Sequence, residues 1–370
     1  MDADVPVPVD YSLDWHYALG GPLGRCLFKS CHDDFLVDEL LPFEPEGEGE
    51  HLFLLIEKKG ENTDWVAGLL ARYAGVTRQS VSYAGRKDRH GVTRQWFCVS
   101  LPGKADPSWA GLESDSIRII RQSRHRKKLK TGALKANDFC ITLRNIDAEP
   151  ARVEARLEQI SREGVPNYFG EQRFGHQGRN VEKAVAMLAG KFRVQRNKRS
   201  VYLSAARSWL FNRVLSEKVG QGSWNQYTPG DVLGFPDSNS LIFDTPDAEL
   251  MARLDRGELS PTSPLWGRGL PKVSDQTLLF EQSITTGFVQ LCDGLEKAGL
   301  QQERKVNRLI PEQMSWSWGN SPEGSLLVLR FRLPKGRFAT SVLRELLSCN
   351  EERHEERHGE YKEEIGIIQD

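Results

Sequence analysis

Apolar residues in the first half of the chain recur mostly at the short spacing of β-strands, with two stretches at helical spacing. Glycine-rich and charged turns separate these stretches. The pattern predicts strands over 51–58, 81–84, 92–101, 117–121 and 139–146. It predicts helices over 63–75, with Thr63 as the capping residue, and over 149–163. Strands joined by short connections pair mostly antiparallel, so we expect an α+β fold in this half.

The second half starts with helical spacing and ends like the first half. Helices are predicted over 180–189 and 201–219, and a stretch rich in glycine and proline over 220–271 is typical of loops and short strands. A helix over 278–298, a strand over 325–333 and a helix over 338–347 follow. This order fits one core that is built from both ends of the chain and interrupted by an inserted middle lobe.

Length and local composition exclude several classes of protein. At 370 residues the chain is longer than most single domains, which favours two lobes with a cleft between them. No apolar run approaches the about 20 residues that cross a bilayer. The acidic start over residues 1–4 lacks the basic region of a secretion signal. The six cysteines lack zinc-ribbon spacing. We therefore expect a cytoplasmic protein with reduced thiols and no membrane partner.

The formal net charge of -1 conceals a strong segregation of charge along the chain. One basic run contains no carboxylate and consists of Arg118, Arg121, Arg124, Arg126, Lys127, Lys128, Lys130 and Lys135. A second basic run covers 191–199, whereas the tail over 350–370 is acidic. Clustered cations are the electrostatic footprint of a nucleic-acid partner, although many such runs are simply solvated faces.

A glycine-bounded turn between two predicted strands carries the densest charge. Gly85 and Gly91 enclose Arg86, Lys87, Asp88 and Arg89 among others. Neighbouring cations favour the ionised carboxylate, so Asp88 should be able to act as a base or a nucleophile. The glycines allow close approach of a ligand, and the cations attract phosphate. On composition alone, a salt-bridged surface turn is the competing interpretation.

Other chemistries lack their motifs. Asp88 and His90, with His32 and Asp33, contain the right atoms for a metal, but no metal-binding motif accompanies them. The nucleophile elbow of serine hydrolases, the Walker loop and the dinucleotide fingerprint are also missing from the sequence. We therefore predict no metal site and no cofactor.

Five stretches in the same order resemble the TruD family of tRNA pseudouridine synthases. The strongest is SYAGRKDRHGVTRQW over 82–96. The others cover 29–39, 127–139, 165–175 with the sequence VPNYFGEQRFG, and 338–342 with the sequence FATSV. One short match could arise by chance, but five ordered matches along nearly the whole chain could not.

The resemblance implies a fold, a reaction and a partner. The fold would be α+β, with a pseudouridine synthase core of mostly antiparallel sheet flanked by helices, and an inserted α+β TRUD domain. The core would cover 1–165 and 313–349, the insertion 166–312, and an acidic tail 350–370. The family converts a uridine of tRNA to pseudouridine without metal or cofactor, and bacterial members act on uridine 13 in the D arm of tRNA(Glu). No obligatory protein partner is implied.

Several site residues follow from the same resemblance. The catalytic aspartate of the family falls on Asp88, as nucleophile or base. Phe35, Phe139 and Phe338 are the candidates to stack on the base, although each could equally be a core residue. Asn137 is expected to bond the uracil edge or Asp88, or else to cap a turn.

The remaining predicted site residues are charged. Lys29 and Glu39 are expected to form an ion pair that lines the pocket. The residues predicted to follow the RNA backbone are Arg86, Lys87, Arg89, Arg124, Arg126, Lys127, Lys128 and Lys130. Gln172 and Arg173 belong to a family motif at the place where the two lobes join. A structural role in shaping this hinge is expected at least as much as contact with RNA. The competing functions are a non-catalytic protein that binds or folds tRNA and a metal-dependent nuclease.

Overall fold

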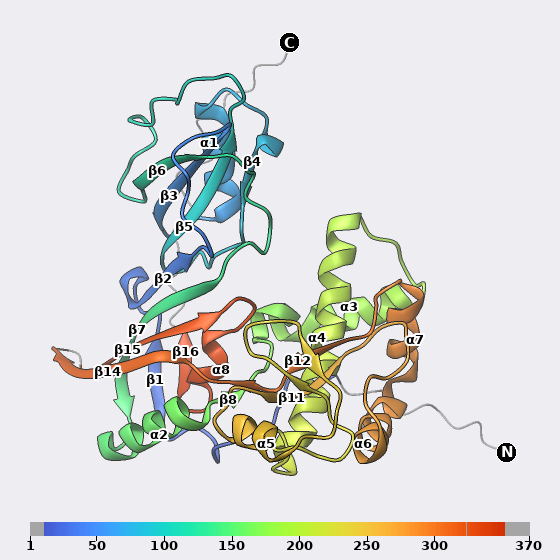
Figure 1. The fold of residues 1–370 in the computed structure, drawn as a ribbon. Coiled ribbons are helices and arrows are strands. Elements are labelled where there is room, and N and C mark those ends of the chain that lie inside the picture. The colour runs from blue at the N-terminus through green and yellow to red at the C-terminus, as the bar shows by residue number, and fades with distance from the viewer. Residues whose placement is uncertain (1–10, 323, 352–370) are drawn as a thin grey trace.

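The computed structural model describes residues 11–322 and 324–351, and a ten-stranded sheet forms its largest element (Figure 1). The strands run in the order β14-β15-β7-β2-β5-β3-β6, with β4 beside β5 and β1 between β7 and β16. All pairs are antiparallel except β2 with β5 and β1 with β16. Their bounds are β1 Arg25–Phe28, β2 Phe35–Leu40, β3 His51–Lys59, β4 Val81–Tyr83, β5 Val92–Ser100, β6 Ile117–His125, β7 Ala136–Asp147, β14 Glu312–Ser321, β15 Gly324–Pro334 and β16 Ser348–Glu351.

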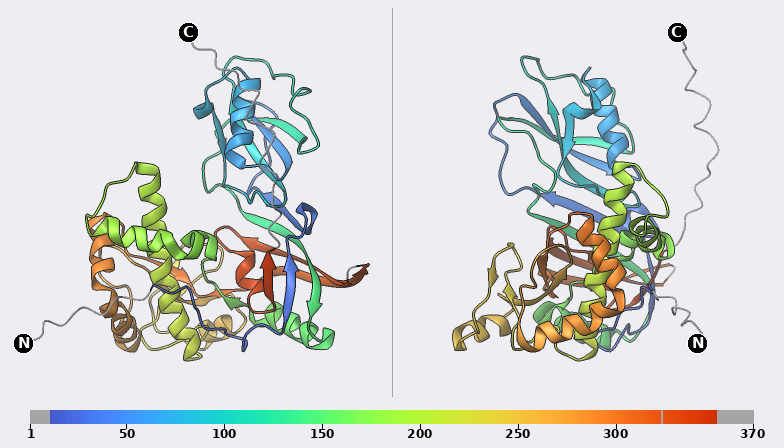
Figure 2. Two further views of the ribbon diagram at one scale, coloured as in Figure 1. Left: turned by 180° about the vertical axis from the view of Figure 1, so that it is seen from behind. Right: turned by 90° about the vertical axis from the view of Figure 1, so that its right-hand side faces the viewer.

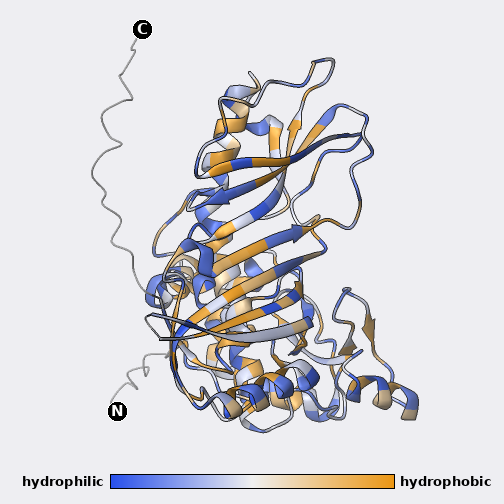
Figure 3. Ribbon diagram, turned by 90° about the vertical axis from the view of Figure 1, so that its left-hand side faces the viewer, coloured by the Kyte–Doolittle hydropathy of each residue, from blue (hydrophilic) through white to orange (hydrophobic). Residues whose placement is uncertain are grey.

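Helices cover the two ends of this sheet separately. α1 (Thr63–Tyr73) packs its apolar face on β3, β4 and β5. α2 (Pro150–Glu163) and α8 (Ala339–Leu343) pack against β1, β2, β7 and β15. Hydrophobic and polar residues alternate along the strands, because one side of each strand faces a core (Figure 3). The expected α+β core with a mostly antiparallel sheet is thereby confirmed.

The middle of the chain forms a second lobe with its own sheet and helices. Its sheet has the order β10-β9-β11-β12, and a short pair of β8 with β13 lies where the chain enters and leaves it. The strands are β8 Val165–Pro166, β9 Leu233–Gly234, β10 Leu241–Ile242, β11 Ser260–Leu265, β12 Glu303–Val306 and β13 Arg308–Leu309. The helices are α3 Arg179–Leu188, α4 Arg196–Gly220, α5 Ala248–Asp255, α6 Asp275–Thr285 and α7 Val289–Lys297. This arrangement supports the proposed insertion, whose boundaries stay a prediction.

The segment that precedes β1 begins on the second lobe, where Trp15 packs, and ends on the large sheet, where Leu19 and Leu23 pack against the core (Figure 2). Trp15 is buried and its ring lies 6.2 Å from that of Tyr168 and 6.1 Å from that of Trp209. The Trp209 indole donates to the carbonyl oxygen of Ser12. By their contacts, residues 11–18 therefore belong with the inserted lobe, and the rest of the segment belongs with the large sheet.

Some predicted elements differ from the observed ones. The helix predicted over 278–298 is broken by the 3₁₀ turn η5 (Thr286–Phe288), and the last predicted helix is shorter, as α8. Asn62, not Thr63, caps α1, because its side chain accepts from the Asp64 amide. The acidic tail over 352–370 lies outside the described residues. Short 3₁₀ turns also occur at η1 His32–Asp34, η2 Arg78–Ser80, η3 Glu171–Phe174 and η4 His176–Gly178.

Candidate active site

Asp88 lies in the connection between β4 and β5, and glycine shapes the end of this connection. A Cβ atom at Gly91 would lie 2.5 Å from the carbonyl oxygen of Phe35, which only glycine allows. A Cβ at Gly85 would make an ordinary contact of 3.7 Å with Leu134. The close approach at Gly91 presses the loop against the start of β2.

Both lobes hold the Asp88 carboxylate. Its Oδ2 accepts from Lys29 Nζ at 2.6 Å and from Gln172 Nε2 at 3.2 Å, and its Oδ1 accepts from the His90 amide at 3.1 Å. Lys29 lies between β1 and η1, whereas Gln172 belongs to η3 of the inserted segment. The side chain of Asp88 keeps 18% of its surface exposed, so the carboxylate remains within reach of a ligand.

These contacts keep Asp88 ionised. Burial by itself would raise the pKa of Asp88. The charge of Lys29 and its hydrogen bond outweigh that effect, with further help from Gln172. The pKa of Asp88 therefore lies below its ordinary value, as predicted, but the cation responsible is Lys29 and not the flanking Arg86, Lys87 or Arg89.

Lys29 is itself held in an unusual conformation. Its φ is 59°, which is uncommon for a residue other than glycine. Its Nζ lies 4.4 Å from the ring centroid of Phe35 and 5.0 Å from that of Phe28. The two rings support the cation without competing for its proton donors.

Lys58 clamps the backbone of the same loop and was missed by the motif-based prediction. It is fully buried, and its Nζ donates to the carbonyl oxygens of Asp88 at 2.9 Å and Glu61 at 2.8 Å. Burial lowers the pKa of Lys58 to about 8, although Asp88 and Glu61 oppose the shift. Strand alternation carried the signal, since Lys58 follows the buried Leu54 and Ile56 at a spacing of two.

The predicted ion pair between Lys29 and Glu39 is wrong. Lys29 pairs with Asp88, and Glu39 pairs with Lys87 at 2.5 Å between Nζ and Oε2. Glu39 is fully buried and also accepts from the Trp96 amide at 3.1 Å. A buried carboxylate needs a partner, and the loop supplies it. Lys87 is consequently unavailable to RNA, contrary to its predicted role.

Asn137 lies beside this buried pair. In the antiparallel register it is opposite Glu39 on β2 and opposite Leu333 on β15, so the three side chains share one face. Asn137 Oδ1 is buried and has no hydrogen-bond partner within residues 11–322 and 324–351. A buried acceptor without a partner is a candidate to bind a donor from a ligand.

A second polar chain supports the start of the loop. Thr63 Oγ1 accepts from the Lys87 amide at 3.1 Å and donates to Gln95 Oε1 at 2.9 Å. Gln95 Nε2 then donates to the carbonyl oxygen of Gly85 at 3.1 Å. Thr63 is thus a buried support of the Asp88 loop and not the cap of α1.

The three predicted aromatic residues occupy different environments. Phe35 and Phe139 are 7% and 9% exposed, and their rings pack against each other and against Phe28 and Phe331. They form the apolar floor below Lys29 and Glu39. Phe338 is only partly buried and lies 5.9 Å from Phe169, which places it at the junction of the lobes.

Most of the predicted RNA-contacting cations are engaged within the protein. Arg86 pairs with Asp64 at 2.9 Å, and Arg89 donates to the carbonyl oxygen of Gly60 at 3.1 Å. Arg124 is mostly buried and pairs with Asp106, and Arg126 pairs with Glu48. The prediction that Arg124 follows the RNA backbone is therefore wrong.

Three exposed lysines keep their predicted accessibility. Lys127, Lys128 and Lys130 are exposed in the loop between β6 and β7, although Lys128 Nζ also donates to the carbonyl oxygen of Gln79 at 3.1 Å. This loop packs on β4 and on the start of the Asp88 connection, since Ser82 Oγ donates to the carbonyl oxygen of Leu129 at 2.8 Å and the Gly132 amide donates to that of Ala84 at 2.6 Å. The lysines thus remain candidates to contact a phosphate near the site.

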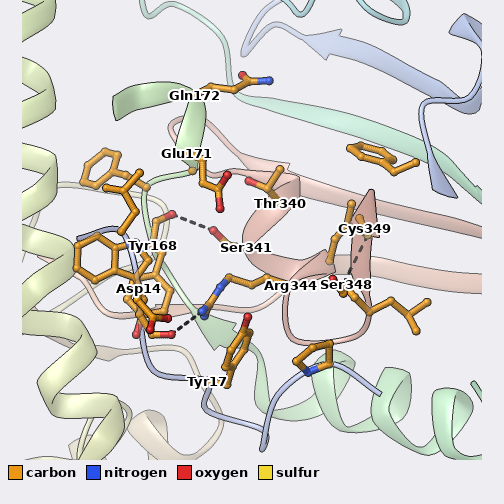
Figure 4. Close-up of a pocket in the computed structure, with 18 residues that line it drawn as sticks. Asp14, Tyr17, Tyr168, Glu171, Gln172, Thr340, Ser341, Arg344, Ser348 and Cys349 are labelled. Atoms are coloured by element: carbon orange, nitrogen blue, oxygen red, sulfur yellow. Dashed lines mark hydrogen bonds between the residues drawn. The ribbon is translucent and has the colours of Figure 1, made fainter. Parts of the chain in front are cut away.

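Figure 4 shows a cavity of about 450 Å³ that Gln172, the donor to Asp88, helps to line. Gln172 and Phe28 line it, together with Tyr168, Ser341 and Arg344. The Ser341 hydroxyl donates to the carbonyl oxygen of Tyr168 at 2.8 Å, which ties α8 to the second lobe. A cavity of this size has room for one nucleoside.

In the described ranges no cluster of His, Cys, Asp or Glu side chains has the makeup of a metal site, and no helix there has the length and apolar character to span a membrane.

A solved structure establishes the class to which this fold belongs. A chain from Methanosarcina mazei, provisionally assigned as tRNA pseudouridine synthase D (TruD), superposes with a TM-score of 0.68 at 22% sequence identity. The match covers 91% of this chain and 96% of that chain. At this identity the likeness shows the fold, which is of the pseudouridine synthase type.

Sequence relatives make the assignment narrower. The family model described as tRNA pseudouridine synthase D (TruD) matches residues 16–197 and 177–346. The tRNA pseudouridine synthase D of Aeromonas hydrophila is 50% identical over 341 residues, which cover 91% of this chain and 95% of that protein. That of Azotobacter vinelandii is 46% identical over 331 residues, which cover 89% and 93%. This chain therefore belongs to the TruD family.

Proposed function

We propose that this protein isomerises a uridine of tRNA to pseudouridine and that Asp88 is its catalytic carboxylate. The observation that carries the proposal is the ionised, partly exposed Asp88 side chain, which Lys29 of one lobe and Gln172 of the other hold in place. A TruD family member with such a carboxylate at the family's catalytic position has the group that the reaction needs.

The reaction rearranges bonds without consuming anything. The N1–C1′ bond of the nucleotide breaks, the base turns, and C5 bonds to the same sugar carbon. C5 then loses its proton and N1 takes one up, so the product is an isomer of the substrate. An ionised Asp88 can assist by adding as a nucleophile or by removing the C2′ proton as a base. Lys29 supports both routes, since its charge keeps the carboxylate ionised before the reaction and can stabilise it again afterwards.

The target uridine must leave its stack, at a cost of a few kcal/mol. Asn137 Oδ1 is proposed to accept from the uracil edge, because it is an unused buried acceptor beside Glu39. Phe35 and Phe139 are proposed to form the floor under the base. Phe338 has more accessible surface for stacking, which returns about 1–3 kcal/mol per base.

The proposed substrate is uridine 13 in the D arm of tRNA(Glu), as the family resemblance implies. A tRNA substrate implies a cytoplasmic enzyme. We propose that it needs neither a cofactor nor a protein partner. Replacement of uridine 13 by cytidine should abolish product on that tRNA, and pseudouridine elsewhere would revise the position without changing the reaction.

The decisive experiment combines purified protein with unmodified tRNA in the presence of a chelator, followed by mapping of pseudouridine. The wild-type protein should form it, and Asp88→Asn should bind the tRNA but form none. Asp33→Asn is the matched control, because Asp33 is an exposed carboxylate that is also paired with a lysine, Lys59. Product from Asp88→Asn would reject the catalytic role. Binding without product in the wild type would favour a tRNA-folding protein, and strand cleavage that the chelator abolishes would favour a nuclease.

A further inference from the structure

Three basic side chains from separate elements converge where the two lobes meet. Arg173 belongs to η3, Lys305 to β12, and Arg337 follows β15. The Arg173 guanidinium lies 5.5 Å and the Lys305 ammonium 4.7 Å from the ring centroid of Phe169. The ring of Phe338, next to Arg337, lies 5.9 Å from the same ring. Arg173 and Lys305 thus flank Phe169, and Arg337 lies near enough to Lys305 for its charge to act on that ammonium group.

The cluster lacks a compensating negative charge. Within 11–322 and 324–351, none of the three cations forms an ion pair with a carboxylate. Burial lowers the pKa of Arg173, and it lowers that of Arg337 to about 10 despite a weak opposing effect of Asp237. Burial, reinforced by both arginines, lowers the pKa of Lys305. An anion bound between the three cations would favour their charged forms and raise their pKa values again.

Most hydrogen-bond donors of the cluster are also unused in the described structure. Arg173 donates to Ser204 Oγ at 2.9 Å, Lys305 to the carbonyl oxygen of Asn167 at 2.9 Å, and Arg337 to that of Pro236 at 3.0 Å. Each bond fixes the position of its side chain. A guanidinium has five N–H donors and an ammonium three, so donors remain for oxygen atoms of a ligand.

The cluster lies next to the catalytic carboxylate. Arg173 directly follows Gln172, which donates to Asp88. Arg337 lines a cavity of about 650 Å³ together with Lys135 and Lys335, although Asp237 and Glu312 also contribute to its wall. The loop over 132–136 on the opposite side of this cavity reaches the start of the catalytic loop, through a hydrogen bond of 2.6 Å from the Gly132 amide to the Ala84 carbonyl.

We propose that Arg173, Lys305 and Arg337 bind one phosphodiester group of the RNA, on a nucleotide that flanks the modified uridine. Planar guanidinium groups match phosphate oxygens, and an aromatic ring between the cations leaves them poorly hydrated and ready to bind. The phosphodiester would anchor the strand while the target nucleotide rotates toward Asp88. This inference rests on the proposed function for the identity of its ligand.

The test pairs protein variants with substrates in which an uncharged methylphosphonate replaces one D-arm phosphodiester at a time. With the wild-type protein, one replacement should weaken binding about tenfold. Arg337→Gln and Lys305→Gln should each weaken binding of the unmodified tRNA about as much, and reduce the salt slope by about 1. The methylphosphonate that weakens binding to the wild-type protein should then cause no further loss of affinity with these variants. Arg152→Gln on the exposed side of α2 is the control, and it should retain the wild-type pattern.

Each outcome decides the proposal. Variants that bind all substrates as the wild type does would overturn it, as would a methylphosphonate effect that persists in Arg337→Gln. Arg337→Lys retains the charge, so its partial recovery of affinity supports an ionic role over a packing role. If inorganic phosphate stabilises the wild-type protein but no methylphosphonate position matters, the site takes free phosphate and the RNA assignment fails. Wild-type protein that shows the binding pattern but makes no pseudouridine would instead reject the proposed function.

Discussion

Two cation-rich regions look alike in sequence but differ in structure. In the loop that carries Asp88, Lys87 is buried against Glu39, while Lys29 from the turn after β1 and Lys58 from β3 reach in to Asp88. On β6, in contrast, Arg118 and Arg121 extend along the sheet edge and pair with Glu57 and Glu44 at 3.1 and 2.9 Å.

The difference teaches that pairing and burial, not charge density, separate a reactive site from a solvated face. Exposed ion pairs such as that of Arg121 with Glu44 contribute little to stability, about 0–1 kcal/mol. A partly buried carboxylate that accepts hydrogen bonds from a cation and from a second donor has its protonation state set by those partners.

The largest effect is expected from Lys29→Met. Loss of a hydrogen bond to a charged group costs about 1.5–3 kcal/mol, which predicts a fall in kcat of about 10- to 100-fold. Because Lys29 lowers the pKa of Asp88, its removal should move the acidic limb of the rate profile to higher pH. Single-turnover rates over a pH series measure both effects. Lys59→Met, which removes an exposed ion pair with Asp33, should change neither, and an unmoved limb in Lys29→Met would contradict the electrostatic role.

Lys58→Met should lower kcat about tenfold with little change in KM, because the clamp on the Asp88 carbonyl is lost. It should also change the pH dependence of stability. The pKa of Lys58 falls from 10.5 to about 8 on folding, so between these values the unfolded chain binds more protons. Stability from this group therefore rises with pH there, by up to about 1.4 kcal/mol per unit. Denaturant titrations of both proteins at pH 8 and 10 should show that the variant lacks this rise.

Replacement of Lys127, Lys128 and Lys130 by glutamine should weaken tRNA binding several-fold and leave the chemical step intact. At ~0.7 per single-strand contact, the slope of log affinity against log salt should fall by about 2. Filter binding at several salt concentrations measures it. The control is Arg118→Gln with Arg121→Gln, whose cations are already neutralised by carboxylates. Equal slopes for the two variants would remove the distinction between the regions.

The smallest functional effect is expected from Arg124→Met. Arg124 bonds Asp106 and the carbonyl oxygens of Gly49 and Lys104, so its loss should reduce the free energy of unfolding by about 1–3 kcal/mol. The tRNA affinity of the folded protein should stay the same. Chemical denaturation measures stability, and tRNA binding well below the unfolding temperature measures affinity, so the two properties are separated. Reduced affinity of the folded variant would show that Arg124 contacts RNA after all.

Local pattern was sufficient for much of the fold. Alternation predicted β3 and β15 to within a residue or so. The spacing of Val153, Leu157 and Ile160 predicted α2, and these three side chains are fully buried. Local pattern missed β14, in which the partly buried Trp316 and Trp318 alternate with exposed small residues, and the break at η5. These features depend on which neighbour a segment meets, which local spacing does not contain.

The sequence by itself determined the family and the catalytic candidate Asp88, because the ordered motifs are local stretches of the chain. It also predicted an ionised Asp88, but Lys29 from another part of the chain, and not the neighbouring Arg86, Lys87 or Arg89, lowers the pKa of this carboxyl group. Only the tertiary structure decided which cation binds Asp88, that Glu39 belongs to Lys87, and that Gln172 crosses from the other lobe. Those pairings join residues far apart in the chain. A charged side chain in a folded protein pairs with whichever partner the packing of strands brings within about 3 Å, and sequence order does not encode that choice.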